Sequence, residues 1–198
     1  MVKWIGLVVS GLMLSISVSS QESGTDCKGF FRWDVKTLTD RGGVDLLSAK
    51  ISDSTLSQMV SVHQPEHLFI LSKKDGRLPR FEVEKQVVKA VVLIMNVRIQ
   101  RDMDMHLILK SPDSDQTMIG EIPDPDCRIF DSLPELKTAF SRARQQIVQV
   151  ADQIKLTGKP VLVEITGIPF WDARHWWLRG CARNGRELHP VLSVKILP

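Results

Sequence analysis

The feature that most constrains the fold of this sequence is one amphipathic helix between two groups of strand-like runs. Its apolar positions alternate in steps of four and three, which is a single stripe on the 3.6-residue helical period. Ser132 and Glu135 have the spacing of a capping box, and Pro134 suits the first turn. Gly158 predicts the helix end. The stripe consists of Leu136, Phe140, Ala143, Ile147, Val150 and Ile154.

Three strand-like runs precede the helix and two follow it. Residues 82–100, 105–110 and 117–122 are predicted to form an antiparallel meander, because short polar turns separate them. Residues 161–166 and 191–197 are the predicted fourth and fifth strands. The order β-β-β-α-β-β is that of the OB-fold, a five-stranded Greek-key barrel. We therefore predict a mainly β, OB-fold-like domain over residues 81–198, with an open α+β sheet as the alternative.

The first twenty residues have the layout of a secretory signal peptide. Lys3 gives a positive start, an apolar run follows, and Val18, Ser19 and Ser20 offer small residues for cleavage. Gly and Ser interrupt the run, which is shorter than the about 20 residues of a spanning helix. We expect an exported protein, periplasmic or secreted, with no membrane span after residues 1–20 are removed. Residues 21–80 are then an N-terminal lead-in segment, with a short strand over 30–37.

The cysteines, which all follow the expected cleavage point, favour a disulfide. Export places a chain in an oxidising compartment, and three cysteines leave one over. Cys127 follows a proline-rich loop that suits the tethering of an N-terminal segment, so we predict Cys27–Cys127. Cys181 would be free or paired between chains. The net charge of +3 is too small to favour a nucleic-acid partner, unless charges cluster locally.

Several short motifs lie in a fixed order along residues 33–192. They include TMIGEIPDPDC at 117–127 and NGRELHPVL at 184–192, with further pieces at 33–40, 104–109 and in the helix at 143–144. Together they resemble an uncharacterised family of exported bacterial proteins with an OB-like core. The resemblance implies export and a shared fold, and it implies no mechanism. Residues 171–179 depart from the family's Phe-, His-, Gln- and Gly-rich run, so a role of that loop in the family does not carry over.

One candidate site is the hairpin that carries Asp102, Asp104 and His106. Side chains at alternate strand positions project to one face, where Glu121 of the neighbouring strand would join them. Carboxylate and imidazole groups suit a divalent metal, which can activate water for hydrolysis of a phosphodiester or a similar bond. The alternative, which we favour, is that the aspartates shape the turn while His106 pairs across the sheet.

His189 is a further candidate, because the proline after it restricts its backbone. With Asp172 and His175 it could complete an acid–base or metal site. No Ser–His–Asp set, HExxH motif or phosphate-binding glycine loop accompanies it. A structural hydrogen bond is the interpretation that we favour for His189.

The loop over residues 171–186 gathers aromatic and cationic side chains. Aromatic faces stack on bases or sugars, and guanidinium groups contact phosphate or carboxylate. OB-folds bind ligands through the corresponding loop, although packing over the barrel end is the alternative. The leading hypothesis is thus a non-enzymatic binding module for a polyanionic, saccharide or protein ligand, without a cofactor. The rival is a metal-assisted hydrolase that uses Asp102, Asp104, His106 and His189 with a divalent metal. The predicted ligand contacts are Trp171, Arg174, His175, Trp176, Trp177, Arg179 and Arg183.

Overall fold

A computed structural model describes residues 26, 27, 29, 31–64, 78–172 and 180–198 of the chain. The predicted signal peptide lies outside these residues, as does the middle of the predicted Trp/Arg loop. None of the described helices is long and apolar enough to cross a membrane. The main elements are α1 (Trp33–Lys36), β1 (Ile51–Asp53), α2 (Leu56–Ser61), β2 (Val87–Ile99), β3 (Met105–Lys110), β4 (Thr117–Ile122), α3 (Pro134–Thr157), β5 (Val161–Trp171) and β6 (Arg186–Ile196), with 3-10 turns at Val44–Ser48, Glu82–Lys85 and Arg128–Phe130.

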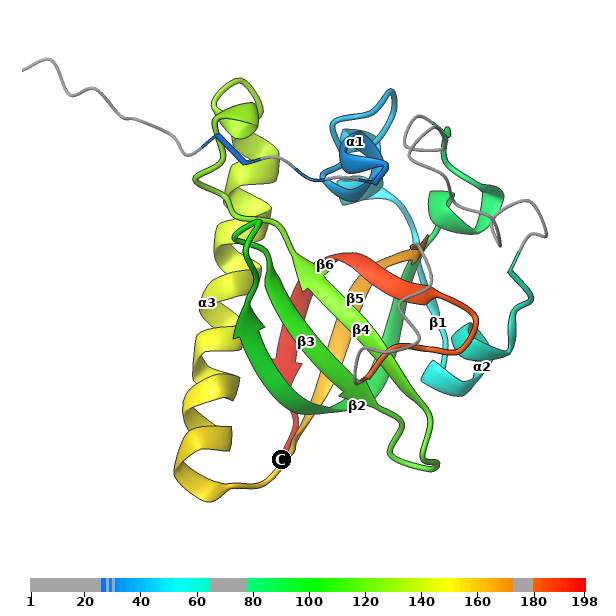
Figure 1. The fold of residues 1–198 in the computed structure, drawn as a ribbon, viewed down its shortest axis with the longest axis vertical. Helices are drawn as coiled ribbons and strands as arrows, with labels where there is room; N and C mark the ends of the chain where they lie inside the picture. Colours follow the sequence, from blue (N-terminus) through cyan, green and yellow to red (C-terminus); the bar gives the residue numbers. More distant parts are fainter. Residues whose placement is uncertain (1–25, 28, 30, 65–77, 173–179) are drawn as a thin grey trace, which may run out of the picture.

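Strands β2 to β6 close into a barrel with the OB topology (Figure 1). The sheet order is β1-β2-β3-β4-β6-β5, and the additional pairing of β2 with β5 closes the ring. Neighbouring barrel strands are antiparallel except β4 and β6, which are parallel. The last strand therefore returns to lie between β4 and β5, as in the Greek key of the OB-fold. The prediction of an OB-fold-like barrel is confirmed.

Strand β2 is long enough to pair with β5 over its first part and with β3 over its second part. Residues 88–94 pair with β5, residues 93–99 pair with β3, and a bulge falls between Ile94 and Asn96. A bulge bends a strand and increases its twist, which lets one strand take part in two halves of a small barrel.

Strands β5 and β6 are longer than the sequence pattern predicts. Gly167, Pro169 and Pro190 interrupt the apolar alternation, but register shifts on either side of Gly167 absorb the irregularity. A Cβ on Gly167 would lie 3.0 Å from the carbonyl oxygen of Pro190, so the close approach of the two strands there favours glycine. Because β6 begins at Arg186, both Glu187 and His189 lie inside the sheet.

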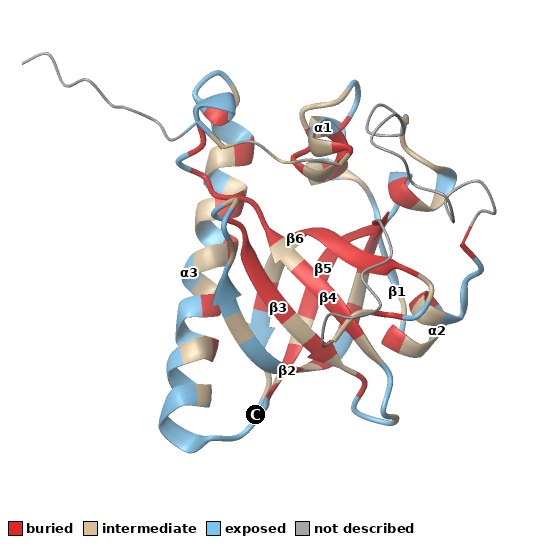
Figure 2. Ribbon diagram, viewed as in Figure 1, coloured by how far each residue is buried: buried red, intermediate tan, exposed pale blue. Residues whose placement is uncertain are grey.

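Helix α3 covers the barrel with the predicted apolar stripe, and its opposite face is exposed (Figure 2). The capping-box prediction is wrong: the N-cap is Leu133, and no side chain caps the helix start. Gly158 ends the helix in the left-handed conformation at φ 65°, as predicted.

The lead-in segment packs against the barrel rather than preceding it as a separate tail. Its predicted strand over 30–37 is wrong, because Arg32 adopts a left-handed backbone at φ 47° that turns the chain into helix α1. Strand β1 extends the sheet by pairing in parallel with β2. The predicted disulfide Cys27–Cys127 is present, with a Cα–Cα distance of 5.4 Å, and ties this segment to the loop after β4.

Candidate metal centre

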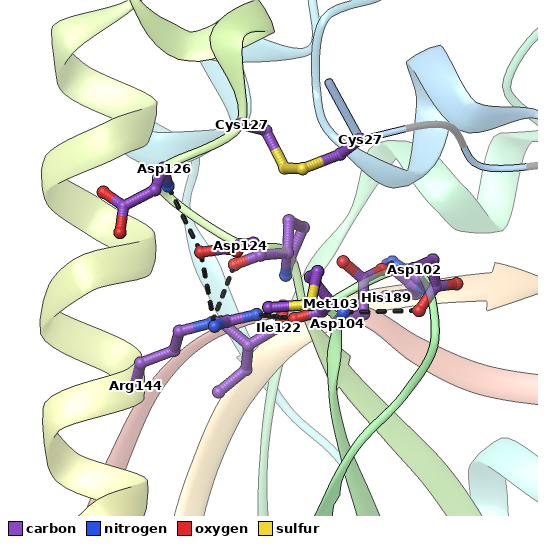
Figure 3. Close-up of a disulfide and its surroundings, with 11 residues drawn as sticks. Cys27, Asp102, Met103, Asp104, Ile122, Asp124, Asp126, Cys127, Arg144 and His189 are labelled. Carbon is purple, nitrogen blue, oxygen red and sulfur yellow. Dashed lines mark hydrogen bonds and ion pairs between the residues drawn. A yellow bond between two sulfur atoms is a disulfide. The ribbon is translucent and has the colours of Figure 1, made fainter. Parts of the chain in front are cut away.

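Asp104, Glu121 and His189 converge at one end of the barrel, and we call these three residues the metal centre. One ligand atom from each lies within 4.8 Å of the other two. His189 Nδ1 is 3.0 Å from Glu121 Oε2, and His189 Nε2 is 3.6 Å from Asp104 Oδ2. Figure 3 shows Asp104 beside His189, below the loop that carries Cys127. Atoms that share one zinc-sized ion at about 2.1 Å lie within roughly 4 Å of one another, so the two carboxylates and one nitrogen of the His189 ring would have to move slightly closer to hold a single ion.

Strand pairing explains why these residues meet. His106 of β3 is opposite Glu121 of β4, which places the start of β3 next to the end of β4. Gly120 pairs with Leu188 in the parallel β4–β6 ladder, so the following residues, Glu121 and His189, are also neighbours. Asp104 enters from the turn that leads into β3, one residue before the strand begins.

Asp104 and His189 are buried without aligned hydrogen-bond partners. Asp104 is 1% exposed and His189 is 0% exposed. Among the described residues, neither carboxylate oxygen of Asp104 and neither ring nitrogen of His189 makes a well-aligned hydrogen bond, despite the close contacts of the ring with the two carboxylates. Burying an unpaired ionised group is strongly unfavourable. A cation held by the Asp104 carboxylate and one nitrogen of the His189 ring would offset part of that cost, because it would ligate carboxylate oxygen and imidazole nitrogen together.

The pKa values differ sharply within the centre. Burial, helped by the charges of Glu121 and Asp102, raises the pKa of Asp104 to about 8. Burial also opposes ionisation of Glu121, but its neighbours His189 and Lys36 lower the pKa of that carboxyl to about 2. Burial lowers the pKa of His189, despite the nearby Glu121. We therefore assign a neutral imidazole beside an ionised Glu121, the states in which these two groups bind metal, whereas Asp104 would have to release its proton when a metal binds.

Among the described residues, the acidic groups around the centre outnumber the nearby cations Lys36 and Arg144. Lys36 of α1 donates a hydrogen bond to Asp172 at 3.1 Å. Burial by itself would lower the pKa of Lys36, but the charges of Asp172, Glu121 and Glu187 raise it. Glu187 is 5% exposed, and burial together with Asp172 and Glu121 raises its pKa. Within the described part of the chain, protons or an added cation would balance the remaining carboxyl groups.

Asp102 and His106 support this centre and do not belong to the converging set. Asp102 accepts a hydrogen bond from the backbone N–H of Asp104 at 3.3 Å, so it shapes the turn. His106 Nε2 lies 3.5 Å from Glu121 Oε1 across the sheet. The structure thus gives both residues the structural places that the sequence favoured for them. Of the four ligands in the metal hypothesis, Asp104 and His189 belong to the converging set, and Glu121 stands there in place of Asp102 and His106.

Trp171, one of the predicted ligand contacts, is 1% exposed and lies beneath the guanidinium of Arg186, 4.3 Å from its ring. It is a packing residue in this structure, which corrects the expectation of an open stacking face. Arg183 is exposed and lines a cavity of about 440 Å³ with Cys181. The remaining predicted contacts lie outside the described residues, namely Arg174, His175, Trp176, Trp177 and Arg179. Ligand binding by this loop stays a prediction.

The free cysteine lacks the properties of a nucleophile. Cys181 is half-buried, and burial together with the charges of Glu187 and Asp172 raises its pKa to about 12. Its thiol is therefore protonated at neutral pH. Cys27, Asp124 and Cys127 also lie close together, but both sulfur atoms belong to the disulfide and do not ligate a metal.

Sequence reasoning missed Lys36 and Glu187. Glu187 lies two residues before His189 on the same strand face, and this spacing was a usable signal. No sequence signal indicated Lys36, because its position depends on how the lead-in segment packs. Comparison with protein families, with curated proteins and with solved structures found no match for this chain.

Proposed function

We propose that this protein binds one divalent metal ion through Asp104, Glu121 and His189. The observation that carries the proposal is the pair of buried side chains, Asp104 and His189, whose polar atoms face each other without a well-aligned hydrogen bond to any described residue. A mixed carboxylate and imidazole set suits zinc or manganese better than calcium, which prefers oxygen ligands alone. Three protein ligands also leave a coordination position for water, as in catalytic sites.

Zinc or manganese is expected to stabilise the chelator-treated protein. A ligand at 100 times its dissociation constant stabilises the folded state by about 2.7 kcal/mol, which corresponds to a rise in Tm of about 5–10 °C for a chain of this size. Asp104→Asn should abolish the rise, because the amide is a poor replacement for a carboxylate ligand. The same variant should keep or raise the Tm of the metal-free protein, because it removes a buried, unpaired acid. Thermal denaturation and titration calorimetry would measure both effects.

The matched control is Asp102→Asn, which makes the same chemical change two residues away in the same turn. It should retain the metal-dependent rise. A purely structural role for Asp104 would instead lower the Tm of Asp104→Asn with and without metal. Absence of any shift with zinc and manganese in the parent protein would refute the metal centre.

A second candidate function is hydrolysis of a phosphodiester at this centre. The observation that favours it is Lys36, whose ammonium group lies among the surrounding acids and could hold an anionic oxygen of a substrate. A bound divalent ion would lower the pKa of water and polarise the phosphoryl group. Attack of that water on phosphorus would form the new P–O bond and break the ester P–O bond, and the leaving alkoxide would take up the proton that the water gives up.

The test is metal-dependent cleavage of bis(p-nitrophenyl) phosphate. Asp104→Asn should abolish cleavage, and Lys36→Met should lower kcat/KM by about 10²-fold, as expected for the loss of a positioned charge. Lys50→Met, which removes an exposed lysine of the same lead-in segment, should leave the rate unchanged. If the protein binds metal tightly and releases no nitrophenol, the centre is not hydrolytic toward this class of ester.

We also propose that the protein is exported and related to the bacterial family that it resembles. The disulfide Cys27–Cys127 supports export, because such bonds persist in oxidising compartments. A binding role for residues 171–186 is a separate proposal, supported among the described residues by the exposed Arg183 beside its cavity.

A further inference from the structure

We propose that Arg144 is a positioning residue for the metal centre, an inference that rests on the proposed metal-binding function. Arg144 lies on helix α3 and does not touch the three ligands through any hydrogen bond of the described structure. Its guanidinium instead binds the backbone on both sides of the centre. It would act by fixing the distance between Asp104 and Glu121.

The contacts of Arg144 fall on the residues next to two of the ligands. Its Nη2 donates to the carbonyl of Met103, the residue before Asp104, and also to that of Ile122, the residue after Glu121, at 3.2 Å. Its Nε donates to the carbonyl of Pro123 at 3.0 Å. Figure 3 shows the side chain reaching from α3 to both loops. One rigid group therefore holds the two ligand-bearing segments together.

The backbone at Met103 explains why a stabilising contact from Arg144 is needed. Met103 has φ 71°, a left-handed conformation that is unfavourable for a residue with a side chain. The conformation turns the following residue, Asp104, into the barrel. A hydrogen bond on the Met103 carbonyl stabilises this turn without contributing a ligand.

Asp124 contacts the guanidinium of Arg144 on its other side. Its Oδ1 lies 3.4 Å from Arg144 Nη1 and accepts a hydrogen bond from the N–H of Asp126 at 3.2 Å. The planar guanidinium of Arg144 thus uses Nε, Nη1 and Nη2 at the same time, which lysine cannot do because it has a single compact donor group. The arrangement orients ligands in the way that outer contacts do in known metal sites.

The test compares Arg144→Met and Arg144→Lys with Arg142→Met, which removes an exposed arginine from the same helix. Zinc affinity is measured by competition with a chromophoric chelator, and the Tm of the metal-free protein is measured in parallel. Arg144→Met should weaken zinc binding by about 10–100-fold, the usual effect of removing such an outer contact. Arg144→Lys should weaken it by less, and Arg142→Met should leave it unchanged. Bound cobalt should show a changed visible spectrum in Arg144→Met, because the ligand geometry relaxes.

The outcomes separate the two proposals. If the parent protein binds no zinc, the metal centre is refuted and the role of Arg144 falls with it. If the parent binds zinc and Arg144→Met binds it equally well, the positioning role alone is refuted, even if the metal-free Tm falls. An equal loss of affinity in Arg142→Met would also overturn it, because net charge rather than position would then be the cause. If Arg144→Met does not fold, an unchanged affinity and cobalt spectrum in Arg144→Lys would overturn it.

Discussion

Glu84→Gln is expected to lower the free energy of unfolding by about 3–5 kcal/mol, because it leaves the charge of Arg32 buried without its counterion. Arg32 and Glu84 are both 0% exposed and form a two-point ion pair, with Arg32 Nη1 at 2.7 Å from Glu84 Oε1. The guanidinium also lies over the rings of Phe81 and Phe170 and donates to the carbonyl of Pro79 at 2.9 Å. No solvent is available there to replace the lost carboxylate.

Glu84 has a second role that increases the expected loss. Its Oε1 accepts a hydrogen bond from the N–H of Trp171 at 2.9 Å, and its Oε2 accepts one from the N–H of Phe81 at 2.8 Å. Glu84 therefore links the segment at Phe81 to the end of β5. The control is Glu82→Gln, whose carboxylate pairs with Lys85 but is 86% exposed. Surface pairs of this kind contribute about 1 kcal/mol or less. Urea denaturation would distinguish the two variants, and equal midpoints would contradict a stabilising role for the buried pair.

Removal of the disulfide, by Cys27→Ala together with Cys127→Ala, is expected to cost about 2–5 kcal/mol. The two cysteines are 100 residues apart, and the loop-entropy account predicts about 4.7 kcal/mol for a loop of that length. The bond joins the lead-in segment to the loop after β4, on the side of the barrel where Lys36 meets the surrounding acids. Its loss should therefore also expose the lead-in segment to proteolysis before the barrel is cleaved.

Cys181→Ala is the matched control, because it removes the half-buried free thiol and leaves the disulfide intact. It should change the free energy of unfolding by less than about 1 kcal/mol. A double variant as stable as the parent in guanidinium denaturation would show that the crosslink adds no stability beyond the packing of the lead-in segment.

The barrel could be predicted from sequence because its main signals are local. The stripe of α3 and the alternation in β3 and β4 each need only neighbouring residues, and their order matches one known topology. Apart from the capping box of α3, the errors lie where distant contacts override the local pattern. Arg32 turns the chain into α1 while paired with Glu84, 52 residues away. The start of β6 was missed because its length depends on irregular pairing with β5 around Gly167.

The metal centre could be predicted only in part for the same reason. The alternation of Asp104 and His106, with Glu121 nearby, is visible in the sequence and is present in the structure. His189 was among the predicted metal ligands, but its place beside Glu121 depends on the parallel pairing of β4 with β6, which no local pattern encodes. The left-handed backbone of Met103 and the contact of Arg144 with its carbonyl could not be predicted either. Both depend on how helix α3, which follows the two ligand-bearing strands in the chain, packs against them.

The position of β6 between β4 and β5 has a kinetic consequence. Asp104 and Glu121 belong to a hairpin that can form early, because its contacts are close in sequence. His189 reaches them only after the chain has passed through α3 and β5 and the last strand has inserted into its gap. A metal that needs all three ligands would bind weakly to every earlier intermediate. During refolding, metal binding would therefore report the closure of the barrel. It would occur later than the appearance of the helical signal from α3.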